Sequence, residues 1–220
     1  MIRLFFTATN AILAILLVAA AITGLFVVPA GAILPVHWGI DGQPDAWQPR
    51  EIALLFPLVL AVAVGLLMAA IRRWGNKGRA ESAVHVLRAA FTAILLLALG
   101  IEVGTVLIGA GYPVSMVQIV CLCVGVLFVL IGNAMPKSQP NGFAGLRIRS
   151  TLNDAANWQA THRLTGVLMI AAGVVIAASG FLIPPSIPLF VFMVVVALLP
   201  GVIGTIYSVM MARRSRAAAR

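Results

Sequence analysis

The sequence predicts an all-α, polytopic membrane helical bundle with six transmembrane helices, and three observations lead to this fold class. First, 62% of the 220 residues are hydrophobic and 10% are charged, whereas soluble domains have roughly 45–50% apolar and about 25% charged residues. Second, the apolar residues form six runs, each near the roughly 20 residues that a membrane-spanning helix needs. Third, charged and turn-forming residues separate the runs. A soluble globular domain is therefore excluded.

The first predicted span runs from Leu4 to Val28 and ends at Pro29. Its apolar core is longer than the roughly 7–15 residues of a secretory signal peptide, so we interpret it as a retained span. Pro200 lies inside the sixth span and predicts a kink there. The other five spans are predicted at Ile52–Ile71, Ala89–Ala110, Val114–Ala134, Leu164–Ile183 and Ile187–Met211.

The basic residues predict the orientation of the bundle. The net charge is +9 and the pI about 11.3, values that would suggest nucleic-acid binding in a soluble protein. However, all but one of the 15 lysines and arginines lie before the first span, in the second and fourth connections or in the tail; the exception is Arg50. Because cytoplasmic loops are enriched in these residues, we expect both termini to be cytoplasmic. The bilayer then explains the charge, and no direct nucleic-acid partner is predicted.

The first connection carries two tryptophans and many turn-forming residues, and we expect it to fold compactly at the outer interface. Three interpretations stay open: a divalent-metal site at His37, Asp41 and Asp45, a recognition surface for an outer ligand, or a structural turn. The three side chains are too few and too poorly suited for a closed zinc site. We therefore predict no metal and no cofactor.

The fourth connection, Pro136–Arg163, predicts a short cytoplasmic amphipathic helix that runs into the fifth span. Thr151 and Asp154 fit an N-terminal capping box, and a helix from there would place Asp154, Trp158 and His162 in one i, i+4 row. This helix is either an interfacial anchor beside anionic lipid, or part of a docking surface or mouth lining made of basic and aromatic residues. The residues of the second interpretation are Arg147, Arg149, Trp158, His162 and Arg163.

Glu102 lies near the middle of the third span, where a carboxylate is costly and by default a functional candidate. Counting depth along the spans places four residues near it, none of them basic, so we expect a protonated carboxyl or a wet cavity. Two roles stay open: a proton-coupled or gating group, and a neutral carboxyl hydrogen-bonded to a backbone carbonyl or to Thr105. The four residues are Thr23, Gly24, Cys121 and Pro200.

Catalytic and redox motifs are not found in the sequence. Cys121 and Cys123 are two apart on a predicted helix and point away from each other, so we expect apolar packing and no disulfide. Nucleophile elbows, phosphate-binding glycine loops and HExxH patterns are absent. We therefore predict that the chain is not an enzyme.

Two motifs in the connections resemble those of membrane-protein families. The pattern PxHWxxDGxPDxW from Pro35 to Trp47 resembles DUF1648, and GLRxxxTLxxxxxWxxxHRxxG from Gly145 to Gly166 resembles the SdpI family. Gly39 and the pair Arg149–Ser150 depart from the usual patterns. The resemblance divides the chain into a DUF1648-like region, residues 1–80, and an SdpI-like region, residues 81–220.

The resemblance implies a bacterial plasma-membrane protein that gives immunity against a secreted toxin peptide and relays the presence of that peptide to a small cytosolic repressor. A small proton-coupled transporter using Glu102 and a structural partner subunit remain alternatives. The implied outer sensing residues are Pro35, His37, Trp38, Asp41, Gly42, Asp45 and Trp47. The implied inner motif residues are Gly145, Arg147, Thr151, Asp154, Trp158, His162 and Arg163.

Overall fold

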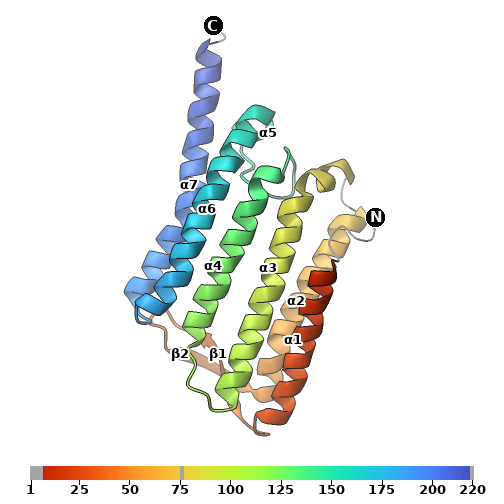
Figure 1. Cartoon of the computed structure of the whole chain (residues 1–220), viewed down its shortest axis with the longest axis vertical. Helices are drawn as coiled ribbons and strands as arrows, with labels where there is room; N and C mark the ends of the chain where they lie inside the picture. The colour runs from red at the N-terminus through yellow and green to blue at the C-terminus, as the bar shows by residue number, and fades with distance from the viewer. Residues whose placement is uncertain (1–6, 75–76, 219–220) are drawn as a thin grey trace.

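The computed structural model describes residues 7–74 and 77–218, which are mostly helical (Figure 1). Six of the described helices are long and apolar enough to cross a membrane, which confirms the number of spans predicted and fits a multi-pass membrane protein. The part of the first predicted span before Thr7 lies outside the described residues. The six helices are α1 (Ala8–Val27), α2 (Arg50–Trp74), α3 (Lys77–Gly109), α4 (Met116–Ala134), α6 (Ala155–Leu182) and α7 (Ile187–Ala218).

The helices form a row rather than a closed ring. Helix α4 packs between α3 and α6, α7 packs on α6, and α1 and α2 both pack on α3 (Figure 1). The α4–α6 contact is close because glycines face each other: a Cβ on Gly125 or Gly173 would lie 2.5 Å from the other residue's carbonyl oxygen. Gly132 and Gly166 make the same contact one heptad away. Small residues allow this backbone approach in membrane helices.

Figure 1 shows two different ends of the row. At one end, the hairpin end, strands β1 (Ile33–Trp38) and β2 (Pro44–Pro49) pair antiparallel between α1 and α2. The other, the basic end, holds the 3₁₀ helix η2 (Met135–Lys137), α5 (Arg149–Leu152) and the last turns of α7. The hairpin departs from the all-α prediction. Both of its strands are edges, which tolerate proline because no inner ladder needs the missing N–H.

Two spans begin earlier than the sequence predicts. Helix α3 starts at Lys77, not Ala89, because its first turns bury Ala83 and Leu87 in a cluster with Met68 of α2. Helix α6 starts at Ala155, not Leu164, because its polar first turns are buried by contacts inside the protein. Helix α7 is continuous through Pro200.

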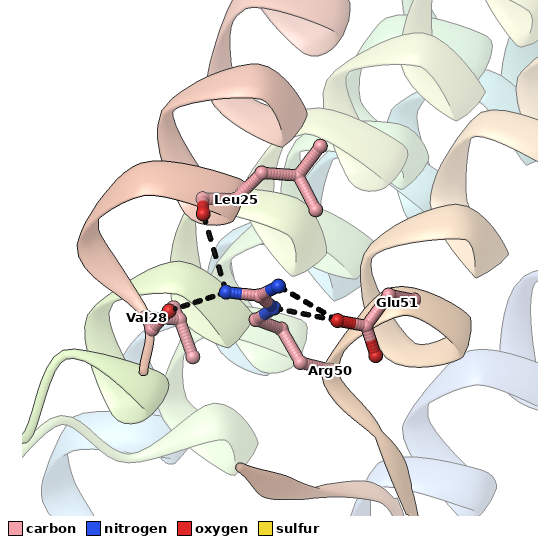
Figure 2. Close-up of polar contacts among 4 residues, drawn as sticks. All are labelled: Leu25, Val28, Arg50 and Glu51. Carbon is pink, nitrogen blue, oxygen red and sulfur yellow. Dashed lines mark hydrogen bonds and ion pairs between the residues drawn. The ribbon is translucent and has the colours of Figure 1, made fainter. Parts of the chain in front are cut away.

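Arg50, the one basic residue predicted on the outer side, closes the end of α1 (Figure 2). Its Nη1 donates to the carbonyl oxygens of Leu25 at 3.2 Å and Val28 at 2.8 Å, and its Nη2 lies 2.7 Å from Glu51 Oε1. The last carbonyls of a helix have no partner within it and carry partial negative charge. The guanidinium therefore fastens α1 to the start of α2, a role that the sequence analysis did not predict.

Candidate functional site

The turn of the hairpin is held by local hydrogen bonds and by the opposite side of the bundle. Asp41 Oδ1 accepts from the Gln43 N–H at 3.0 Å, and the Gly39 N–H donates to the Gln43 carbonyl at 2.8 Å. Gly42 has a φ of +80°, and a Cβ there would lie 2.4 Å from Pro185 Cβ in the α6–α7 connection. The hairpin tip thus rests on the connection between α6 and α7, so the hairpin joins the two ends of the row of helices.

An apolar cavity of about 360 Å³ lies beneath the hairpin. Its walls come from β1 and the hairpin turn, from Ile101 of α3, from the first turns of α4 and from the start of α7, and Cys121 Sγ lies 3.4 Å from Met193 Sδ. Three predicted outer residues, His37, Trp38 and Gly42, line this cavity. The apolar side chains opposite them include Val117, Val120, Cys121, Leu189, Phe190 and Met193.

The remaining outer candidates lie on the hairpin surface, where the His37 side chain is also exposed. His37 Nδ1 is 2.5 Å from Asp45 Oδ1, and both side chains are more than half exposed. Trp47 lies opposite Pro35 in the strand register and is 52% exposed. Among the described residues, no cluster of three or more histidine, cysteine or acidic side chains is placed to hold a metal ion. The hairpin therefore offers an exposed ion pair and an indole beside an apolar cavity.

At the basic end, the inner motif forms a buried cluster instead of a surface. Trp158 and His162 are fully buried and stacked, with ring centroids 3.9 Å apart. The Trp158 indole N–H donates to the Ser138 carbonyl at 3.1 Å. Because His162 Nε2 accepts the Leu146 N–H at 3.1 Å, the ring proton is on Nδ1, 2.8 Å from the Trp158 carbonyl oxygen. The expectation that these two rings belong to a docking surface is therefore wrong.

Steric contact with the His162 ring explains why the inner motif has glycine at position 145. Gly145 has a φ of +113°, which L side chains rarely adopt, and a Cβ there would lie 2.3 Å from His162 Nε2. The loop after α4 can therefore lie directly on the histidine ring only with glycine at this position.

The predicted capping box is wrong, whereas the predicted helix does continue into the fifth span, as α6 from Ala155 to Leu182. Thr151 lies inside the single turn α5, where its hydroxyl donates to the Leu146 carbonyl at 2.6 Å and accepts the Ile148 N–H at 3.2 Å. Asp154 is instead the N-cap of α6, accepting the N–H groups of Ala156 and Asn157. The aspartate restarts the chain as a new helix because its carboxylate satisfies the first free N–H groups. The row of three residues shrinks to the Trp158–His162 pair.

A second polar group, which the sequence analysis missed, ties α6 to α7. Asn157 Nδ2 donates to the Ser208 carbonyl at 2.9 Å, and the Ser208 hydroxyl donates to Asn157 Oδ1 at 2.6 Å. Thr161 and Ser150 complete the group through bonds of 3.0 and 2.7 Å. Asn157, Thr161 and Ser208 are buried, and a search for polar residues near the ends of the spans would have found them.

The arginines of the inner motif lie on the protein surface. Arg147, Arg149 and Arg163 are exposed, and Arg147 Nη1 also donates to the Gly142 carbonyl. The buried rings and the polar group therefore position a loop that presents arginines at the basic end.

Glu102 is fully buried, and one of its predicted neighbours, Gly24 of α1, meets Val106, one turn from Glu102. Thr23 is exposed and bonds to its own helix, while Cys121 belongs to the cavity under the hairpin. Within the described residues neither carboxyl oxygen of Glu102 has a hydrogen-bond partner. The structure thus does not contain the predicted hydrogen bond to Thr105 or to a backbone carbonyl.

Comparisons with known proteins find one family match for the region of the hairpin and another for the region of the inner motif. Residues 12–61, which include the hairpin, match "Domain of unknown function (DUF1648)", and residues 137–208 match the "SdpI/YfhL protein family". The second match spans the polar cluster from Ser138 to Ser208. "Immunity protein SdpI" of Bacillus subtilis (strain 168) is 27% identical over 176 residues, 80% of this chain and 81% of that protein. No solved structure matches the chain. By these matches the chain has an SdpI/YfhL-type region at residues 137–208 and a DUF1648 region at residues 12–61, and it is a distant homologue of Immunity protein SdpI.

Proposed function

We propose that this chain is a bacterial membrane immunity and signalling protein. Its hairpin end faces outward and receives a secreted toxin peptide or a similar membrane-active agent. Its basic end, with both termini, faces the cytoplasm and contacts an acidic surface of a small cytosolic repressor. The distant relative's name supports the immunity role, and no catalytic reaction is part of the proposal.

The apolar cavity beneath the hairpin is the observation that carries the outer half of this proposal. It combines DUF1648 motif residues with apolar side chains of α4 and α7, and apolar pockets with a few polar groups are the usual form of a ligand site. An amphipathic peptide would place an apolar side chain in the cavity. Its polar face would meet the exposed pair His37–Asp45 and the Trp47 indole at the rim.

The exposed arginines support the inner half. Arg147, Arg149 and Arg163 stand at one end with the exposed Arg213 and Arg214 of α7. An excess of arginine and lysine marks the cytoplasmic side of membrane proteins. The same positive field would attract an acidic partner or anionic lipid. The motif's buried residues then act by fixing the loop that carries Arg147.

Filling the cavity tests the outer half. We would express the chain in a peptide-sensitive bacterium and measure survival against a panel of secreted membrane-active peptides. Val120→Phe replaces a small aliphatic side chain of the cavity wall with a bulky aromatic ring and is expected to abolish any protection. The matched control is Val174→Phe on the exposed side of α6, which should protect like the unmodified chain once membrane levels are equal.

Two results would count against this function. If the unmodified chain gives no protection against any peptide of the panel, the immunity role fails. If Val120→Phe protects as well as Val174→Phe, the cavity is not the ligand site, even though immunity itself stands.

A further inference from the structure

Glu102 lies on the side of α3 that faces away from α4. A Cβ on Gly100 or Gly104 would touch α4 side chains, so that face of α3 meets α4. Val106, one turn beyond Glu102, instead meets Gly24 of α1. Since residues four apart share a helix face, Glu102 points to the side of α3 that packs against α1 and α2.

A second cavity, of about 430 Å³, lies between α1, α2 and α3. It extends from Thr7 and Asn10 at the basic end to Leu58 of α2. Leu58 is one turn nearer the basic end than Leu54, and Leu54 contacts the same Gly24 that Val106 meets. On α2 the cavity therefore reaches the level of Glu102, whereas on α3 its lining ends at Leu95, two turns nearer the basic end. Helical side chains lean toward the N-terminus of their helix, which for α3 is the basic end, so the carboxyl leans toward this cavity.

No fixed charge faces Glu102 from its neighbouring elements. Helix α1 has no ionisable residue, and α2 has none from Ile52 to Ile71. Helix α4 offers only Cys121 and Cys123, and Cys123 lies against Gly100 on the other side of α3. Strand β1, which touches α3 at the hairpin end, carries His37, whose partner is Asp45.

An ionised carboxylate without a partner is strongly disfavoured in apolar surroundings. Among the described residues neither oxygen of Glu102 has a hydrogen-bond partner, so a proton is the ligand that neutralises the group. We propose that Glu102 is a proton-binding site inside the membrane, loaded from the basic end through the cavity between α1 and α2. This site is independent of the proposed immunity function and of the cavity under the hairpin.

Dicyclohexylcarbodiimide, an apolar reagent, tests the proton site in the full-length protein in lipid vesicles. The carboxylic acid O–H adds across one C=N bond of the reagent, and the O-acylisourea rearranges to a stable N-acylurea without a leaving group. Mass spectrometry should find this adduct on Glu102, with a yield that falls from mildly acidic to alkaline pH. Glu102→Gln should carry none, and the exposed Glu51 and Glu81 serve as internal comparators.

The opposite results overturn the proposal. Glu102 that stays unmodified at every pH in the folded protein has no accessible proton site, and a pH-independent yield shows that no proton is exchanged.

Cysteine accessibility tests the path, in a background with Cys121 and Cys123 replaced by alanine. Leu58→Cys lines the cavity, whereas the control Leu54→Cys is packed against Gly24. A membrane-impermeant maleimide added at the basic end should label Leu58→Cys several-fold faster than Leu54→Cys. Equal rates, or labelling of Leu58→Cys only from the hairpin end, would contradict loading through this cavity.

Discussion

Gly145→Ala is the sharpest test of how the inner motif is built. Two costs add at this position. The φ of +113° is unfavourable for an L residue by roughly 1–2 kcal/mol. The new Cβ would also lie 2.3 Å from His162 Nε2, so the loop must move and the Leu146 N–H loses its acceptor, which costs about 1–3 kcal/mol for a buried donor. We take the lower part of that range because the bond is only partly buried, and expect a total of about 2–4 kcal/mol.

Detergent-solubilised protein and denaturant unfolding provide the assay, followed by tryptophan fluorescence because Trp158 stacks on His162. Gly142→Ala is the matched control: it lies in the same loop, its φ is not positive, and nothing lies within 4 Å of the added methyl group. In a His162→Ala background only the backbone strain should remain, so the cost of Gly145→Ala should fall to about 1–2 kcal/mol. Equal stability of Gly145→Ala and Gly142→Ala would refute the reasoning.

Two further predictions concern the hairpin end. Arg50→Ala leaves the carbonyls of Leu25 and Val28 without their charged donor and should lower the unfolding free energy by about 1–2 kcal/mol; Glu51→Gln, at the exposed partner, should leave the unfolding midpoint unchanged, and equal effects would contradict the helix-closing role of Arg50. Gly42→Ala and Gly31→Ala share a φ near +80° and hence a strain of roughly 1–2 kcal/mol, but only Gly42 touches Pro185. Thermal unfolding should therefore show a larger loss for Gly42→Ala, and equal losses would mean that the hairpin tip does not depend on this contact.

The sequence alone determined the six spans, because each is a run of apolar residues about as long as a bilayer is thick, and that signal needs no tertiary information. It also identified the two motif-bearing connections. It did not predict the hairpin: three prolines in Pro35–Pro49 weaken the strand signal, and pairing of two edge strands is decided by their turn and by the contact of Gly42 with Pro185.

Only the tertiary structure decided what the inner motif does and where Glu102 points. From the sequence, Trp158 and His162 look like residues of an amphipathic surface helix, yet they are buried because the loop through Ser138 and Gly145 folds over them. The residues that complete this cluster, such as Ser208, are far away in the chain and become neighbours only when α6 and α7 pack. Likewise, depth along a span gave the level of Glu102, but its facing side depends on the rotation of α3. That rotation follows from glycine contacts with α4, which no local pattern encodes.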